Sequence, residues 1–178
     1  GLTIVLKYSG GELVQAITRG NGEIGEDVTH NARVFANLPL KIAFDGELVL
    51  RGEGVISYSE FQRINEELGE GEAYKNPRNL CSGTVRQLNS EIAAKRNVQF
   101  FAFTLVSAEG KELSDSKTEN MQWLASLGFT VVESKVVTGD TILDAVEYFR
   151  EHIESNDIAS DGLVLCLLYT SPSPRDTR

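Results

Sequence analysis

The sequence predicts an α+β fold in which antiparallel sheets are flanked by helices. Residues 2–8 alternate apolar and polar side chains, which is the pattern of a strand with one buried face. A Ser-Gly-Gly-Glu turn at 9–12 leads into a second strand-like run at 13–18, so the two runs form a predicted hairpin. Strand and helix patterns then follow one another irregularly, which favours antiparallel pairing over a doubly wound parallel sheet.

The later elements are predicted from capping residues and apolar spacing. Glu26 and Asp27 suit a helix N-terminus, where carboxylates are stabilised, and Val28, Ala32 and Phe35 follow at helical spacing. The same kinds of signal predict a strand over 47–56, a helix capped by Ser59 and ended by Gly69, a helix over 77–88, a strand over 98–106, a helix from Ser116 to Gly128, a strand over 129–137, a helix capped by Asp140 and a strand beginning at 162.

Length, charge and cysteine content limit the class of protein. The chain has 178 residues and a net charge of −9, which argues against a free-standing DNA-binding module, because such modules usually carry a basic surplus. Two cysteines, Cys81 and Cys166, do not make a disulfide framework and indicate reduced thiols in the cytoplasm. No apolar run approaches the ~20 residues of a membrane helix. His30 and His152 are isolated from other ligand residues, so we expect no metal site built by the protein.

A glycine-rich stretch follows the second strand and contains the first candidate site residue. Gly20, Gly22 and Gly25 have the spacing of a dinucleotide-binding turn, and Arg19 comes directly before them. The residues that follow lack the strand–helix–strand pattern and the acidic ribose ligand of that fold, so we disfavour a dinucleotide-binding turn. A flexible loop beside an exposed arginine remains the simplest alternative.

A glutamate and two arginines are the strongest candidates for ligand contact. Glu53 lies between two glycines on a predicted strand, where a ligand can approach the backbone closely; a structural pairing with Arg51 is the alternative. Arg78 and Arg86 are eight residues apart on one predicted helix, so they share a face at about 12 Å. Guanidinium groups bind phosphate bidentately and stay charged. A pair of solvated surface arginines is the alternative.

Taken in order, these motifs resemble one family. They are Thr18-Arg19-Gly20-Asn21-Gly22, Gly25-Glu26-Asp27, Arg51-Gly52-Glu53, Asn76-Pro77-Arg78-Asn79 and Arg86-Gln87-Leu88. At these distances they resemble the adenylation (nucleotidyltransferase) domain of bacterial NAD-dependent DNA ligases. The resemblance implies an ATP-grasp-like nucleotidyltransferase fold over residues 1–165. It also implies NAD as cosubstrate, Mg²⁺ as cofactor, nicked duplex DNA as the partner of the complete protein, and a monomer.

The resemblance also implies roles for individual residues. Arg19 would lie near the nucleotide, Glu53 would bind the ribose of AMP, and Phe103 would stack on adenine, where a core position is the alternative. Val164, in the Asp-Gly-Leu-Val-Leu segment, would flank the adenine ring. Arg78 and Arg86 would contact the activated phosphate or the 5′-phosphate at a nick.

The resemblance leaves both ends of the chain incomplete. The family's nucleophile is a lysine in a Lys-x-Asp-Gly motif whose glycine aligns with Gly1, so no catalytic residue is expected within the chain, and the chain alone should not form lysyl-AMP. Residues 166–178 resemble translated adapter sequence, and Cys166 stands where the family has a lysine that contacts the α-phosphate. Two other functions stay open, an ATP- or GTP-dependent nucleotidyltransferase and a non-catalytic nucleotide-binding fragment.

Overall fold

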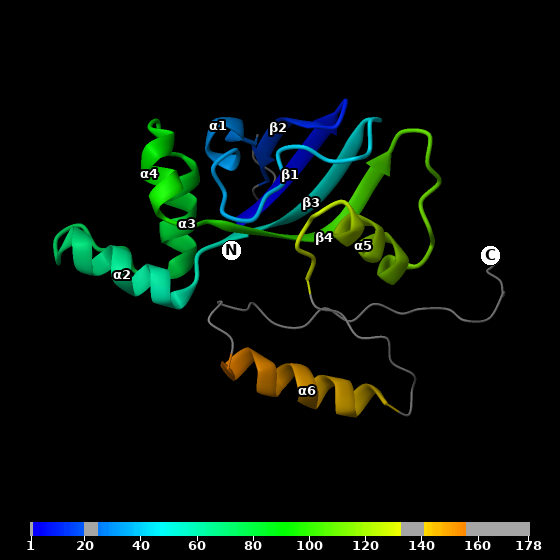
Figure 1. Cartoon of the computed structure of the whole chain (residues 1–178). Coiled ribbons are helices and arrows are strands. Elements are labelled where there is room, and N and C mark those ends of the chain that lie inside the picture. The colour runs from blue at the N-terminus through cyan, green and yellow to red at the C-terminus, as the bar shows by residue number, and fades with distance from the viewer. Residues whose placement is uncertain (1, 20–24, 133–140, 156–178) are drawn as a thin grey trace.

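The computed structural model describes residues 2–19, 25–132 and 141–155, and its centre is one antiparallel sheet (Figure 1). The strand order is β2-β1-β3-β4, and every pair of neighbours is antiparallel. The strands are β1 (Leu2–Ser9), β2 (Glu12–Thr18), β3 (Leu48–Val55) and β4 (Gln99–Ala108). The predicted α+β class with antiparallel pairing is therefore confirmed.

The described helices are α1 (Thr29–Ala32), α2 (Tyr58–Leu68), α3 (Pro77–Val85), α4 (Ser90–Lys95), α5 (Lys117–Ser126) and α6 (Ile142–Ser155). Of these, α1, α3 and α5 pack against strands of the sheet. Figure 1 shows α1 beside β2 and α5 beside β4, so these two helices lie at opposite edges of the sheet. Helix α3 contacts the two central strands, β1 and β3.

One face of the sheet forms the hydrophobic core. Alternate side chains of β1 are completely buried, namely Ile4, Leu6 and Tyr8, as the period of two requires. They pack in one cluster with apolar side chains from α1, α3, α5 and the segment after α1, which include Ala32, Phe35, Leu80, Val85, Met121 and Leu124. Tyr8 also packs edge-on against Phe129, with ring centroids 5.3 Å apart. Burial of this apolar surface is the main stabilising term of the fold.

The opposite face of the sheet is half-buried and partly polar. The intervening residues of β1 and β3 point to this face, and they include Thr3, Arg51 and Glu53. The same alternation that buries Ile4 therefore puts the predicted ribose ligand on the face away from the core.

Several helix boundaries differ from their predictions. The cap of α2 is Ser57, whose side chain accepts a hydrogen bond from the Glu60 amide, so the prediction of Ser59 was wrong by two residues. Helix α3 ends at Val85 instead of continuing to Leu88, which puts Arg86 at its C-cap. The cap by Ser116 at α5 is confirmed. Of the predicted strand over 129–137, residues 129–132 form only an isolated bridge from Val131 to Ala102, and the rest lies outside the described residues. The Asp140 cap and the strand from 162 also lie outside the described residues.

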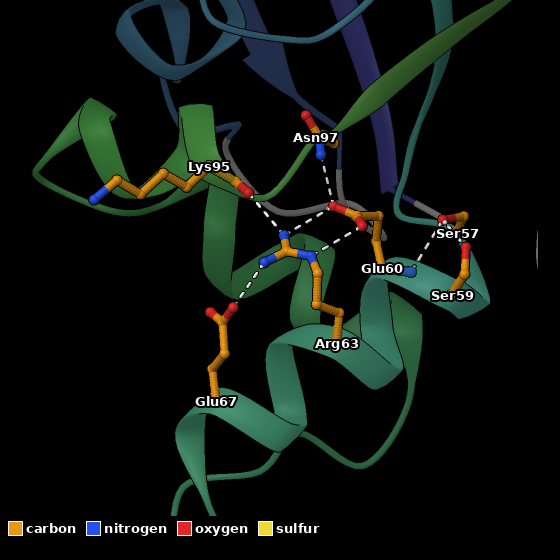
Figure 2. A network of polar contacts seen from close by, with 7 residues as sticks. All are labelled: Ser57, Ser59, Glu60, Arg63, Glu67, Lys95 and Asn97. Atoms are coloured by element: carbon orange, nitrogen blue, oxygen red, sulfur yellow. Dashed lines mark hydrogen bonds and ion pairs between the residues drawn. The ribbon is translucent and has the colours of Figure 1, made fainter.

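A polar network joins α2 to α4 (Figure 2). The guanidinium of Arg63 donates to Glu60 and Glu67 on its own helix and to the Lys95 carbonyl, at 2.9–3.0 Å. These hydrogen bonds lower the pKa of Glu60 and raise that of Arg63. A groove of about 470 Å³ lies beside this network, and none of the predicted site residues lines it.

Gly52 on β3 has no room for a side chain. A methyl group added there would meet the Phe101 carbonyl oxygen at 2.3 Å and the Phe100 ring at 2.4 Å. We expect Gly52→Ala to lower the free energy of unfolding by about 1–3 kcal/mol, because overpacking displaces the strand or the ring. Urea unfolding would measure the loss. Gly71→Ala, where nothing lies within 4 Å, is the matched control and should change stability little; equal effects of the two variants would contradict the packing argument.

Candidate functional site

The strand register brings two predicted site residues into one row across the sheet. Arg19 follows the end of β2, and its backbone amide donates to the Thr3 carbonyl on β1 at 2.9 Å. Thr3 pairs in turn with Glu53 on β3. Since neighbouring strands are about 4.8 Å apart, the backbones of Arg19 and Glu53 are separated by roughly 10 Å.

Glu53 is held by a side-chain contact within this row. The Thr3 hydroxyl Oγ1 donates to Glu53 Oε1 at 3.1 Å, and Glu53 is partly exposed. For the alternative pairing with Arg51, the structure shows that the Arg51 Nε is buried without a hydrogen-bond partner in the described part of the chain, so this nitrogen does not donate to Glu53. Sequence reasoning missed the role of Thr3, whose only signal was its place on the same predicted face as Lys7.

Two aromatic side chains of β4, Phe101 and Phe103, lie on the half-buried face. Phe101 is the residue paired with Glu53, while Phe100 and Ala102 point into the core. The register shifts between Arg51 and Gly52, where Thr104 and Ala102 are the successive partners, so Phe103 is the extra residue of a β-bulge. The predicted shared face of Phe101 and Phe103 agrees with their partial burial. The bulge gave no sequence signal.

Arg86 is linked to the sheet near Arg19 through the carboxylate of Glu26. Its Nε donates to Glu26 Oε2 at 2.9 Å, and its Nη1 donates to the Ser82 carbonyl at 3.1 Å and to the Ser82 hydroxyl. Glu26 is fixed to β2, because its backbone exchanges hydrogen bonds with Thr18, the residue before Arg19. A continuous chain of contacts therefore links Arg86 to the row that contains Glu53.

The remaining predicted residues are less closely connected. Arg78 is exposed in the first turn of α3, where Asn76 caps the helix and Pro77 occupies its first position. No described contact joins Arg78 to Glu53 or to Arg86. Val164 lies outside the described residues.

The described residues show neither a metal cluster nor a membrane-spanning helix. Within residues 2–19, 25–132 and 141–155, no three His, Cys, Asp or Glu residues gather in a group that could hold a metal ion. Among the helices in those ranges, none combines the length and the apolar composition needed to cross a membrane. Cys81, buried against Gly54 under the sheet, has its pKa raised to about 12 by burial.

The fold and this set of side chains define a class of protein. An α+β domain that puts Arg19 and Glu53 in one row of a sheet, with Arg86 bonded to Glu26 at the neighbouring strand, offers guanidinium groups that can bind a phosphate and a carboxylate that can accept from hydroxyl groups. The model of one family, the NAD-dependent DNA ligase adenylation domain, matches residues 1–170. The chain belongs to this family.

Curated relatives agree with this assignment. The chain is 58% identical over 166 residues to a DNA ligase of Lachnoclostridium phytofermentans and 55% identical over 166 residues to a DNA ligase of Ruminiclostridium cellulolyticum. Each match covers 93% of this chain and 25% of the relative. A DNA ligase of Clostridioides difficile is 36% identical, over 98% of this chain and 28% of its own length. The chain thus spans about a quarter of the length of these relatives.

The hydrogen bonds of Asp27 should make the stability of the protein depend on pH. Its Oδ1 accepts hydrogen bonds from the Thr29 hydroxyl at 2.6 Å and the Thr29 amide at 2.9 Å, and these lower its pKa below the usual value. A lowered folded-state pKa contributes stability above the unfolded-state pKa of about 3.9 and loses it as the pH falls further. We therefore expect Asp27→Asn to destabilise the protein near neutral pH, with a difference that shrinks at acid pH.

Urea unfolding of the parent and of Asp27→Asn at about pH 7 and about pH 3 would measure this difference. Asp115→Asn, which removes an exposed carboxylate outside this segment, is the control. A difference between parent and variant that stays constant across this range would contradict the role of the ionised carboxylate.

Proposed function

We propose that this chain forms the AMP-binding part of an NAD-dependent DNA ligase that seals nicks in duplex DNA. One observation carries the proposal: in a chain of this family, the sheet register puts Arg19 and Glu53 in one row, and Arg86 is tied to that row through Glu26. The complete protein would act through lysyl-AMP and DNA-adenylate intermediates.

The proposed reaction is three successive transfers at phosphorus. A lysine amine attacks the α-phosphorus of NAD, so that a P–N bond forms and nicotinamide mononucleotide leaves. An oxygen of the 5′-phosphate at the nick then attacks the same phosphorus and displaces the lysine. Finally the 3′-hydroxyl attacks the 5′-phosphorus, which joins the strand and releases AMP. The nucleophile is the lysine that the family motif puts three positions before Gly1.

Glu53 would bind the sugar of the nucleotide. An ionised carboxylate accepts hydrogen bonds only, so it can take one from each ribose hydroxyl. Thr3 holds one carboxylate oxygen and limits its rotation, which reduces the entropy lost when the ribose binds. Phe103 would stack on the adenine, and Val164 would flank the adenine ring.

The arginines would bind phosphate. Charge develops on the non-bridging oxygens during each transfer, and fixed positive groups stabilise it without reorganising. Arg86, Arg78 and Arg19 would supply these groups. Their number is small against a net charge of −9, so binding of nicked DNA would depend on the other parts of the complete protein.

Mg²⁺ enters only as an expectation of the family resemblance. Because the described residues contain no cluster of three possible ligands, they do not by themselves fit a resident Mg²⁺ site. No step above depends on one.

A chimera would test the proposed function. The 166-residue segment of the Lachnoclostridium phytofermentans ligase that matches this chain would be replaced by the corresponding residues of this chain. We expect the chimera to seal a nicked duplex with NAD and not with ATP. A chimera that melts like the parent ligase but uses ATP, or seals nothing, would contradict the proposal; melting curves separate this result from misfolding.

The ribose contact generates a prediction for the chain itself. The full 178-residue chain should bind AMP more tightly than 2′,3′-dideoxy-AMP, because Glu53 accepts from both hydroxyls. Glu53→Gln should reduce AMP affinity by about 10-fold or more, since hydrogen bonds to a charged group contribute about 1.5–3 kcal/mol. It should also remove most of the preference for AMP over the dideoxy analogue.

Isothermal titration calorimetry would measure both affinities. Glu66→Gln, an exposed glutamate on α2, is the matched control and should retain the preference. If Glu53→Gln keeps the full preference for AMP while the protein remains folded, Glu53 does not bind the ribose.

A further inference from the structure

Asn31 is a completely buried polar residue that the proposed function does not use. Its Nδ2 donates to the Val85 carbonyl at 2.6 Å and the Gln87 carbonyl at 2.8 Å, with a longer contact to the Thr84 carbonyl at 3.4 Å. These carbonyls lie on both sides of Arg86 in the sequence. One side chain from α1 thus fixes the backbone that carries Arg86.

This contact satisfies groups that the end of α3 leaves open. The last carbonyls of a helix have no partner inside the helix, and leaving one buried and unpaired costs about 1–3 kcal/mol. Helix α3 ends at Val85 without a glycine, and its C-cap is Arg86. Asn31 therefore acts as a C-terminal cap supplied by another element, 54 residues earlier in the chain.

The segment around Asn31 holds Arg86 from a second direction. Glu26 accepts from the Arg86 guanidinium at 2.9 Å, and His30 Nε2 lies 2.9 Å from the Gln87 carbonyl oxygen. The other side of the segment is bonded to β2, where the Val28 amide donates to the Ala16 carbonyl at 2.8 Å. The segment that contacts both the backbone around Arg86 and its side chain is therefore itself hydrogen-bonded to β2, a strand of the sheet that carries Glu53.

We propose that Asn31 is a positioning residue, which holds the end of α3 so that the Arg86 guanidinium is directed at a phosphomonoester. The phosphate belongs to AMP or to the 5′ end of a nicked strand. Its identity rests on the proposed function, but the positioning of Arg86 by Asn31 does not.

Phosphate discrimination by the full chain is the first measurement. One arm compares AMP with adenosine, and the other compares a nicked duplex bearing a 5′-phosphate with one bearing a 5′-hydroxyl. Asn31→Leu keeps the approximate shape of the side chain but removes the donor. We expect it to reduce the preference for the phosphorylated ligand by about 5-fold or more in at least one arm, and to have no further effect when combined with Arg86→Ala.

A matched control separates positioning from general destabilisation. Asn37 also makes two hydrogen bonds to backbone, away from Arg86: its Nδ2 donates to the Phe100 carbonyl at 3.0 Å, and its Oδ1 accepts from the Phe100 amide at 2.7 Å. Asn37→Leu should lower stability and leave phosphate discrimination unchanged. If Asn31→Leu does not fold, Asn31→Ala, which also removes the donor, takes its place with the same expected results.

The second measurement is NMR ¹⁵N relaxation of the Arg86 side chain, which needs no ligand. The Nε–H group of Arg86 should be rigid in the parent by ¹⁵N relaxation, mobile in Asn31→Leu and rigid in Asn37→Leu. The proposal would be overturned if the Arg86 Nε–H group stays as rigid in Asn31→Leu as in the parent. It would also be overturned if Asn31→Leu and Arg86→Ala have additive effects on phosphate discrimination. If Arg86→Ala alone leaves phosphate discrimination intact, the phosphate role of Arg86 is wrong, and the relaxation data then decide whether Asn31 positions it.

Discussion

The candidate site depends on the register of β1 between its two neighbours. Thr3 accepts a backbone hydrogen bond from Arg19 on one side and pairs with Glu53 on the other. A slip of one residue would turn the Glu53 carboxylate toward the core and Gly52 outward, because side chains alternate along a strand. The register is enforced from the core side, where Ile4 and Leu6 are completely buried and cannot exchange faces without a large loss of apolar burial.

The short segment over 26–31 extends this constraint to the helices. It bonds to β2 through Val28 and Thr29 and to the end of α3 through Asn31. An exposed ion pair such as Arg86 with Glu26 contributes little to stability by itself, about 0–1 kcal/mol. Buried amide-to-carbonyl hydrogen bonds contribute more, because breaking them leaves unpaired polar groups inside the protein. The geometry of Arg86 therefore depends more on Asn31 than on the carboxylate that its guanidinium contacts.

Local sequence patterns were informative where one element decides its own structure. The hairpin, the buried alternation of β1 and the Ser116 cap of α5 all follow from neighbouring residues. The prediction failed at Ser59, because Ser57 offers an equally good cap two residues earlier and nothing local favours one over the other. The prediction also failed at the end of α3. Helix-forming residues continue to Leu88, but the helix ends at Val85, whose carbonyl accepts a hydrogen bond from Asn31.

Local sequence patterns were enough to predict the fold class, the alternating burial along the first strand and the family, since alternation, capping and ordered motifs are properties of short segments. Only the tertiary structure decided that Arg19 and Glu53 share a row, that Phe103 occupies a bulge and that Asn31 holds the end of α3. These facts join residues far apart in the chain. They arise because burial of one continuous core sets which strands pair and which polar groups must find partners across elements.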